Sequence, residues 1–459
     1  MNLQYTVSVE LGNLDSQSFE SLELKIRDGM FQTGRELLLQ LWGLWEENFK
    51  LRHPGARSAG RREAAFKTAV GELRYSRLRV TNRGRFFVPL DEWTSVSGRE
   101  RATPGFLSRV EAGVVHLPFR QATSILEAET GVRQSAMSSW RQTQRRAETA
   151  RARLELAKKK VSVLHDGPRA RSYAEKTWRE DPAVLDPKCP IICIEADATY
   201  CKNQDKLGIR HEVKVAILYT EKTRISRKGK PRFKIEDKLS LIQNPGESLL
   251  SFQSRIGQTA RVYFGATNKT VLLVRGDGDS WIQDIARNEF HGAIYFLDPW
   301  HVQKKLREAV GPEEFEKFRH FVHQSNPDGL IAALREAYLE PDLEACGARG
   351  AVVPHPKKLE QIEQFIQYID NNREGLLPRP ELKPLRERFP GMLCRGSGAM
   401  ERAIDQVVGE RCKRKRMAWS RTGLDNLLLL RKNQINRQYG PKLRTQPVQA
   451  SISLTGTPT

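Results

Sequence analysis

The pattern of apolar and polar positions predicts a helical start to the chain, followed by a β-hairpin. Within residues 16–50, leucines and Trp42 recur at helical intervals along "QSFESLELKIRDGMFQTGRELLLQLWGLWEENFK" (residues 17–50), which predicts an amphipathic helix. Residues 73–92 alternate apolar and polar side chains around an Asn-Arg-Gly turn, which indicates a hairpin. We therefore expect residues 1–72 to be an N-terminal helical segment for packing or oligomerisation.

A possible helix-turn-helix follows in residues 117–147 ("LPFRQATSILEAETGVRQSAMSSWRQTQRRA"). Two helices separated at residues 130–132 have the apolar spacing of that motif, with glycine at the turn. An ordinary helical hairpin would have the same spacing. The side chains expected to be buried are Leu126, Val132, Met137 and Trp140.

The outward face of the second helix is suited to nucleic acid, because its side chains can reach phosphates and base edges. We expect residues 73–185 to be a basic DNA-binding region that ends at a domain boundary near residue 185. The residues predicted to contact DNA there are Arg133, Gln134, Ser138, Arg141, Arg145 and Arg146.

The remainder predicts an α/β fold. Three consecutive strands are followed by alternating helices and strands, and this βββαβαβα order is that of a ribonuclease-H-like fold. The predicted strands are 191–201, 211–220, 232–242, 270–275 and 293–297, with helices at 246–262, 280–290 and from about 300. We expect a catalytic core at 186–310, an α-helical insertion at 311–395, a final core helix at 396–432 and a flexible tail at 433–459.

Charge favours a polyanionic partner. The 459 residues carry a net charge of +21. Residues 1–50 are acidic, whereas 51–180 and 401–446 are strongly basic, which is typical of nucleic-acid binding. No apolar run is long enough for a membrane span, and no signal-peptide pattern opens the chain, so we expect a cytoplasmic protein.

The six cysteines are irregularly spaced, which favours reduced thiols over a disulfide framework. Cys189, Cys193 and Cys201 could be considered zinc ligands, but their spacing matches no usual zinc motif.

Carboxylates mark the candidate chemistry. Period two in "IEADATY" places Glu195, Asp197 and Thr199 on one face of a strand. Asp277 follows another apolar strand and has glycine on both sides. In the predicted fold these two strands are neighbours, so Asp197 and Asp277 would meet. Carboxylates without a histidine or cysteine cage suit Mg²⁺ and phosphoryl transfer.

Five motifs in order carry a resemblance to a known family. They are "IEADATY", "RGDGDSWI", "LDPWH", "YIDNNREG" and "GSGAMERAIDQVVGERCKRKRMAWSRTGLDNLLLLR". In this order they resemble the core motifs of the DDE transposases of bacterial insertion sequences, closest to the ISLre type. The resemblance extends from about residue 70 to residue 432.

The resemblance implies a ribonuclease-H-like core with two Mg²⁺ ions, for which Mn²⁺ could substitute. Asp197, Asp277 and Glu401 match the three catalytic and metal-binding acids, and Asp298 and His301 match a supporting Asp-x-x-His element. The chain departs from the family at residues 198–200, where a further acid and a histidine are common. It also has Asp279 where alanine is common, and Asp279 competes with Asp277 as a ligand.

We therefore expect a transposase that binds the terminal inverted repeats of an insertion sequence as double-stranded DNA, cleaves a strand and joins it to target DNA. Synapsis of two ends implies a homodimer or a higher oligomer. A second predicted DNA contact is the basic run Lys413, Arg414, Lys415 and Arg416.

Other interpretations stay open. A structure-selective nuclease or resolvase would use the same site without strand transfer, and a DNA-binding regulator would use the acids structurally. In the structural interpretation, Asp277 is a turn acid, Glu401 complements a helix dipole and Asp197 pairs with Lys214 across strands.

Overall fold

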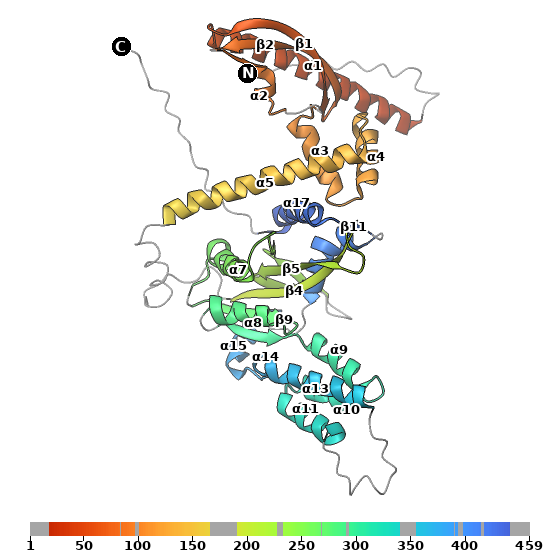
Figure 1. Cartoon of the computed structure of the whole chain (residues 1–459), viewed down its shortest axis with the longest axis vertical. Coiled ribbons are helices and arrows are strands. Elements are labelled where there is room, and N and C mark those ends of the chain that lie inside the picture. Colours follow the sequence, from red (N-terminus) through yellow and green to blue (C-terminus); the bar gives the residue numbers. More distant parts are fainter. Residues whose placement is uncertain are drawn as a thin grey trace. The chain divides into compact units, whose positions relative to one another are not determined.

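The computed structural model describes residues 18–82, 84–96, 101–165, 191–226, 233–267, 269–290, 293–339, 355–389, 391–392, 398–414 and 417–440. The chain divides into two compact units, Met1–Ala152 and Arg153–Thr459, and the division falls within one long helix (Figure 1). The domain boundary predicted near residue 185 lies outside the described residues. No helix in the described ranges is both long and apolar enough to cross a bilayer.

The first unit begins with a long helix that packs on an antiparallel sheet, and three further helices end it. Ser18 caps the first helix, because its hydroxyl accepts a hydrogen bond from the Ser21 N–H at 3.2 Å. In chain order the elements are α1 (Phe19–Arg52), β1 (Arg57–Thr68), β2 (Gly71–Asn82), β3 (Arg85–Phe87), α2 (Pro89–Trp93), α3 (Pro104–Val114), α4 (Phe119–Thr130) and α5 (Ala136–His165).

The predicted first helix and the hairpin formed by β2 and β3 are confirmed. The prediction that residues 1–72 are helical is wrong for β1, which pairs antiparallel with β2. Only residues 64–68 of β1 alternate clearly between buried and less buried positions, whereas its first half is exposed and rich in arginine. The period-two signal was therefore too short to indicate a strand.

A buried carboxylate fixes α1 to the sheet. Trp42 lies edge-on to Phe66, with ring centroids 4.9 Å apart, and Glu46 is only 2% exposed. The Glu46 carboxylate accepts hydrogen bonds from the Arg61 guanidinium at 2.6 Å, the Tyr75 hydroxyl at 3.1 Å and the Leu78 backbone N–H at 2.8 Å. Burial of this charge is tolerated because donors from both β1 and β2 surround it.

The predicted turn between α4 and α5 is present, and Gly131 ends α4 in the left-handed conformation, with φ at 68°. Leu126 and Val132 are buried as predicted. The prediction that Met137 and Trp140 are buried is wrong, since they are 55% and 37% exposed.

The buried side of α5 is polar. Apart from Ala147, the buried side chains among the described residues of α5 are Ser139, Gln142 and Thr143, so apolar spacing could not reveal this side. The hydrogen bonds include Thr123 with Ser139 at 3.0 Å and the Gln134 amide to the Ser139 hydroxyl at 2.7 Å.

The second unit is a mixed α/β fold. Its elements are β4 (Ile191–Asn203), β5 (Arg210–Tyr219), β6 (Glu221–Arg224), β7 (Phe233–Glu236), β8 (Leu239–Ile242), α7 (Leu249–Phe264), β9 (Val271–Gly276), α8 (Ser280–Asp284), η2 (Ile285–Glu289), β10 (Ile294–Leu297), α9 (Pro299–Val310), α10 (Phe315–His323), α11 (Pro327–Leu334), η3 (Arg335–Leu339), α13 (Pro356–Asn371), α14 (Arg373–Leu376), η4 (Pro380–Leu382), α15 (Lys383–Arg388), α16 (Gly398–Ile404), η5 (Asp405–Lys413), β11 (Ala418–Trp419) and α17 (Arg421–Tyr439).

The main sheet has the order β10-β9-β4-β5-β8, and β11 pairs with the end of β4. β4, β5 and β8 are antiparallel neighbours, whereas β9 and β10 run parallel to β4. The predicted adjacency of the strand that bears Asp197 and the strand that ends before Asp277 is thus confirmed. The described residues of the expected insertion at 311–395 form helices from α10 to α15.

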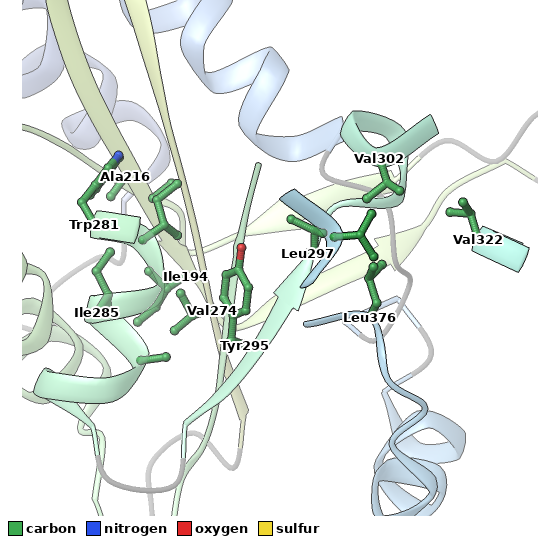
Figure 2. Packing of buried hydrophobic residues seen from close by; sticks show 14 of the residues in the cluster. Ile194, Ala216, Val274, Trp281, Ile285, Tyr295, Leu297, Val302, Val322 and Leu376 are labelled. Carbon is green, nitrogen blue, oxygen red and sulfur yellow. The ribbon is translucent and has the colours of Figure 1, made fainter. Parts of the chain in front are cut away.

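The two faces of β4 differ in polarity, as its period-two pattern predicts. Ile192, Ile194 and Ala196 belong to the main apolar core, together with Phe252 of α7 and Trp281 of α8. Figure 2 shows part of this cluster, where side chains from the sheet, α8 and α9 meet. The odd-numbered side chains of β4 therefore point to the opposite face, on the side of α16.

Two boundaries differ from the predictions. In place of the single strand predicted at 232–242, the described residues from Phe233 onward form β7 and β8 in different sheets, because the chain turns at Asp237, which has a φ of 49°. The flexible tail predicted from residue 433 is wrong for residues 433–439, which continue α17. The Asn436 side chain bonds both backbone groups of Ser240 at 2.8 Å, so this polar segment is held by the sheet. Residues 441–459 lie outside the described residues.

We expect Glu46→Gln to lower the free energy of unfolding of the first unit by about 1–3 kcal/mol, because the Arg61 charge loses its buried partner. Urea unfolding followed by tryptophan fluorescence measures the change. Glu23→Gln, at an exposed position of the same helix, is the matched control and should shift stability by less than about 0.5 kcal/mol. Equal effects of the two substitutions would show that Glu46 does not anchor α1.

Candidate active site

A pocket of about 630 Å³ lies beside the middle of β4 and the carboxyl end of β9, between α9 and α16. The three acids that match the transposase triad all line it, although they come from distant parts of the sequence. The polar and charged residues around it are Glu195, Asp197, Thr199, Arg275, Asp277, Asp298, His301, Lys304, Lys305, Glu308 and Glu401.

The floor of the pocket is a buried ion pair between the two neighbouring strands. Glu195 and Arg275 are register partners in β4 and β9, and the Arg275 guanidinium lies 3.4 Å from the Glu195 carboxylate. The same carboxylate accepts hydrogen bonds from the Tyr219 hydroxyl of β5 at 2.5 Å and from the Met400 N–H of α16 at 3.0 Å. Glu195 thereby fixes the first turn of α16, which carries Glu401, beside β4.

Asp197 lies one strand repeat beyond Glu195 and is half-buried. Its carboxylate accepts a hydrogen bond from the Ala198 N–H at 2.6 Å. Burial, followed by repulsion from Asp277, raises the pKa of Asp197 to about 7, with smaller contributions from Asp279 and Asp298. Such crowding of acids favours any cation that can take the place of the proton.

Asp277 lies on the sharp turn after β9. Gly278 has a φ of 107°, and a Cβ there would come within 2.5 Å of the Tyr368 ring, so glycine is required. The Tyr368 hydroxyl donates to the Asp277 carbonyl oxygen at 2.6 Å. The competing acid, Asp279, is exposed and accepts a hydrogen bond from the Trp281 indole at 3.3 Å. Since the pocket is lined by Asp277 and not by Asp279, the geometry favours Asp277.

Glu401 is exposed and lines the pocket from α16. Its rival, Asp405, lies where the helix widens into the π-helix η5, and its carboxylate pairs with Arg414 at 2.7 Å. The pocket lining includes Glu401 and Ile404 but not Asp405. This arrangement favours Glu401 as the third acid of the site.

The Asp-x-x-His element also reaches the pocket. Asp298 is 2% exposed and caps α9, because its carboxylate accepts a hydrogen bond from the Trp300 N–H at 3.0 Å. His301 Nε2 lies 3.9 Å from the Asp298 carboxylate. The rings of His301 and Trp300 are nearly perpendicular, with their centroids 4.8 Å apart.

Sequence reasoning missed two lysines. Lys304 and Lys305 line the pocket from the next turn of α9, and Lys304 lies one helical turn beyond His301. This spacing in "PWHVQKKLREAV" is a signal that they share the side of α9 with His301. Two cations beside several acids can bind the phosphate groups of a substrate.

Among the described residues, no three or more His, Cys, Asp and Glu side chains are close enough together to hold a metal ion. The three acids therefore share a pocket without forming a compact cluster. For the zinc alternative, Cys189 lies outside the described residues, and burial raises the pKa of Cys201 to about 11, which keeps its thiol protonated at neutral pH.

The structural interpretation of Asp197 receives no support from Lys214. The register of β4 and β5 pairs Asp197 with Val215, and the Lys214 ammonium lies 2.5 Å from the Glu212 carboxylate.

The residues predicted to contact DNA fall into two groups. Some already bind within the protein: Arg146 pairs with Glu111 at 2.6 Å, Gln134 belongs to the polar cluster on α5, Lys413 donates to the Thr199 hydroxyl at 2.8 Å, and Arg414 pairs with Asp405. Others lie at the surface: Arg141 and Arg145 are exposed. Arg133 is also exposed but pairs with Glu127 at 3.2 Å, and the partly exposed Ser138 hydroxyl accepts a hydrogen bond from Ser135 at 3.2 Å. Lys415 and Arg416 lie outside the described residues.

We expect Asp197→Asn to stabilise the protein in chelator-containing buffer above about pH 7 but not near pH 4. The folded state holds a proton on Asp197 up to about pH 7, whereas the unfolded carboxyl loses it near its ordinary pKa of 3.8. The free energy of unfolding of the wild type therefore falls as pH rises from about 4 to about 7, by on the order of 1–4 kcal/mol. The asparagine amide of the variant does not titrate, so the variant does not lose this stability. Thermal unfolding across this pH range tests it, and a gain that does not change with pH would contradict it.

Two comparisons with known proteins identify relatives. Residues 18–445 match the model of a family described as "Uncharacterised protein family (UPF0236)". A protein of Streptococcus gallolyticus described as "UPF0236 protein in vanSb 3'region" is 24% identical over 381 residues, which cover 80% of this chain and 71% of the relative. The family match includes both units and all three acids of the pocket. The chain therefore belongs to the UPF0236 family.

Proposed function

We propose that this protein is a metal-dependent DNA transposase with a ribonuclease-H-like catalytic unit. One observation carries the proposal: Asp197, Asp277 and Glu401 line the same pocket, although Glu401 follows a long helical segment after Asp277. The sheet order β10-β9-β4-β5-β8 supports it, because three antiparallel strands followed by two parallel ones match the expected fold.

The donor set suits magnesium. Every candidate ligand is a carboxylate, and Mg²⁺ in phosphoryl-transfer sites is held by one or two carboxylates together with water and substrate phosphate. Asp197 and Asp277 would hold the metal, and Glu401, which is exposed at the pocket, would complete the site when DNA is bound. Bound Mg²⁺ would supply Lewis acidity and an activated water or 3′-hydroxyl.

The protein's own residues would then position the DNA backbone. Lys304 and Lys305 would neutralise phosphate oxygens from the α9 side, and His301, oriented by Asp298, would contact the phosphate next to them. The Glu195–Arg275 pair is too deeply buried to reach substrate, so its role would be to hold the strands and α16 in place.

The first unit would provide DNA recognition, because residues 51–152 carry 19 Lys and Arg side chains against 9 Asp and Glu. Exposed arginines at the start of α5 would contact phosphates or base edges of the terminal repeats, as in a helix-turn-helix.

We expect Asp197→Asn and Glu401→Gln each to reduce Mg²⁺-dependent cleavage of terminal-repeat DNA by on the order of 100-fold or more, because each removes a ligand charge. Asp405→Asn is the matched control for Glu401→Gln, since Asp405 pairs with Arg414, and it should retain most activity. All three variants should bind repeat DNA within about twofold of wild type. Gel assays of nicking and of strand joining measure both steps.

The outcomes separate the alternatives. Cleavage without joining would indicate a nuclease or resolvase, and sequence-specific binding without cleavage would indicate a regulator. Full activity of Asp197→Asn would exclude the proposed metal site.

We expect Arg141→Ala to weaken binding to the repeat DNA, because an exposed arginine releases counterions when it binds phosphate. The slope of the logarithm of the affinity against the logarithm of the salt concentration should become shallower by about 1. Arg146→Ala should mainly lower stability, since Arg146 pairs with the largely buried Glu111. Fluorescence anisotropy at several salt concentrations, with thermal unfolding alongside, separates these effects. An Arg141→Ala variant with an unchanged salt slope would remove Arg141 from the DNA interface.

A further inference from the structure

The long helix α1 has a second apolar face that does not pack on the sheet. Six large apolar side chains recur along it at intervals of three, four, seven or eleven residues, which places them on one side of a helix. Their exposed fractions lie between 39% and 82%. We call this set the α1 stripe: Phe19, Ile26, Met30, Leu41, Leu44 and Leu51.

The α1 stripe is distinct from the face that holds α1 in the fold. Trp42 and Glu46 are buried against β1 and β2, and partly buried Leu38 and Trp45 pack beside them. At about 100° per residue, Trp42 and Glu46 point well away from the stripe, whereas Leu38 and Trp45 lie between the two faces. An ordinary surface helix is polar on the side opposite the core, so a row of exposed apolar side chains marks an interaction surface.

The spacing of the α1 stripe is nearly symmetric about Arg35. Phe19 and Leu51 are equally distant from Arg35 in the sequence, and so are Ile26 and Leu44. If a second copy of α1 lies antiparallel across the stripe, Phe19 meets Leu51 of the other copy, and Ile26 meets its Leu44. A two-fold interface requires such self-complementarity, because each surface contacts an identical copy of itself.

The charges along α1 fit an antiparallel pair better than a parallel one. With the helices antiparallel about Arg35, Glu20 near one end comes opposite Lys50, whereas Glu23 comes opposite Glu47. A parallel pair would instead place every charge opposite its like, with Glu20 against Glu20 and Lys50 against Lys50, which is unfavourable.

We propose that α1 is the dimerisation element of this protein. In the dimer, the α1 stripe packs against α1 of a second copy, which lies antiparallel about a two-fold axis near Arg35. The helix has 34 residues and is about 51 Å long. A contact strip about 10 Å wide along the helix would bury about 1,000 Å² of surface, summed over both copies. This area is near the smallest total buried area found in specific protein interfaces. The dimer therefore dissociates on dilution. This inference does not depend on the proposed enzymatic activity.

Sedimentation velocity of the full chain over a wide range of concentrations tests the proposal. We expect a reversible monomer–dimer equilibrium, weakened at least about tenfold in the double variant Ile26→Glu and Leu44→Glu. Leu24→Glu is the matched control, because Leu24 is 43% exposed on the same helix but lies outside the stripe. It should leave the equilibrium unchanged. A wild-type chain that is monomeric at all concentrations, or a dimer unaffected by the double variant, would overturn the proposal.

Cysteine cross-linking tests the orientation. Oxidising a mixture of an Ile26→Cys protein and a Leu44→Cys protein should yield a disulfide-linked dimer that contains one chain of each. Each variant alone should give no more dimer than wild type, because like positions are separated by about 27 Å along antiparallel helices. Efficient cross-linking of Leu44→Cys alone would show a parallel pair and contradict the antiparallel register.

Discussion

The buried pair of Glu195 and Arg275 is the interaction on which the candidate site depends. It joins β4 to β9 at register partners, and the Glu195 carboxylate also holds β5 through Tyr219 and α16 through the Met400 N–H. One strand repeat beyond the pair lie Asp197 and Asp277, and one residue beyond Met400 lies Glu401. A buried ion pair adds little to the net free energy of unfolding, because its attraction must offset the cost of removing both charges from water. Removing one partner lowers that free energy strongly, since the other charge is left buried and unpaired. The pair therefore serves mainly to fix relative positions.

The first unit follows the same design with Glu46. There too a buried carboxylate accepts hydrogen bonds from neighbouring strands, and it fixes the rotation of α1 about its own axis. That rotation determines which apolar side chains enter the core and which form the α1 stripe. In both units a buried acid thus decides which neighbouring side chains face outward for a partner or a substrate.

Sequence patterns predicted the elements whose signal is apolar periodicity, namely α1 and the core strands β4, β5, β9 and β10. They failed where polar groups pair internally, as at Ser139 on α5 and at Asn436 on α17, because periodicity counts such residues as solvent-facing. The predicted order of the strands was sufficient to predict that Asp197 and Asp277 lie close together. The position of Glu401 needed the family resemblance, since no local pattern reveals the hydrogen bond from Met400 to Glu195.

In the proposed function, Asp197 in the middle of β4 and Asp277 after the end of β9 bind the catalytic metal. Anomalous diffraction from crystals of the full chain grown with Mn²⁺ tests this most directly. We expect a peak about 2.0–2.4 Å from carboxylate oxygens of both Asp197 and Asp277, within the range for hard cations with oxygen ligands. Mn²⁺ bound only elsewhere, with the side chains of Asp197 and Asp277 unliganded, would contradict it.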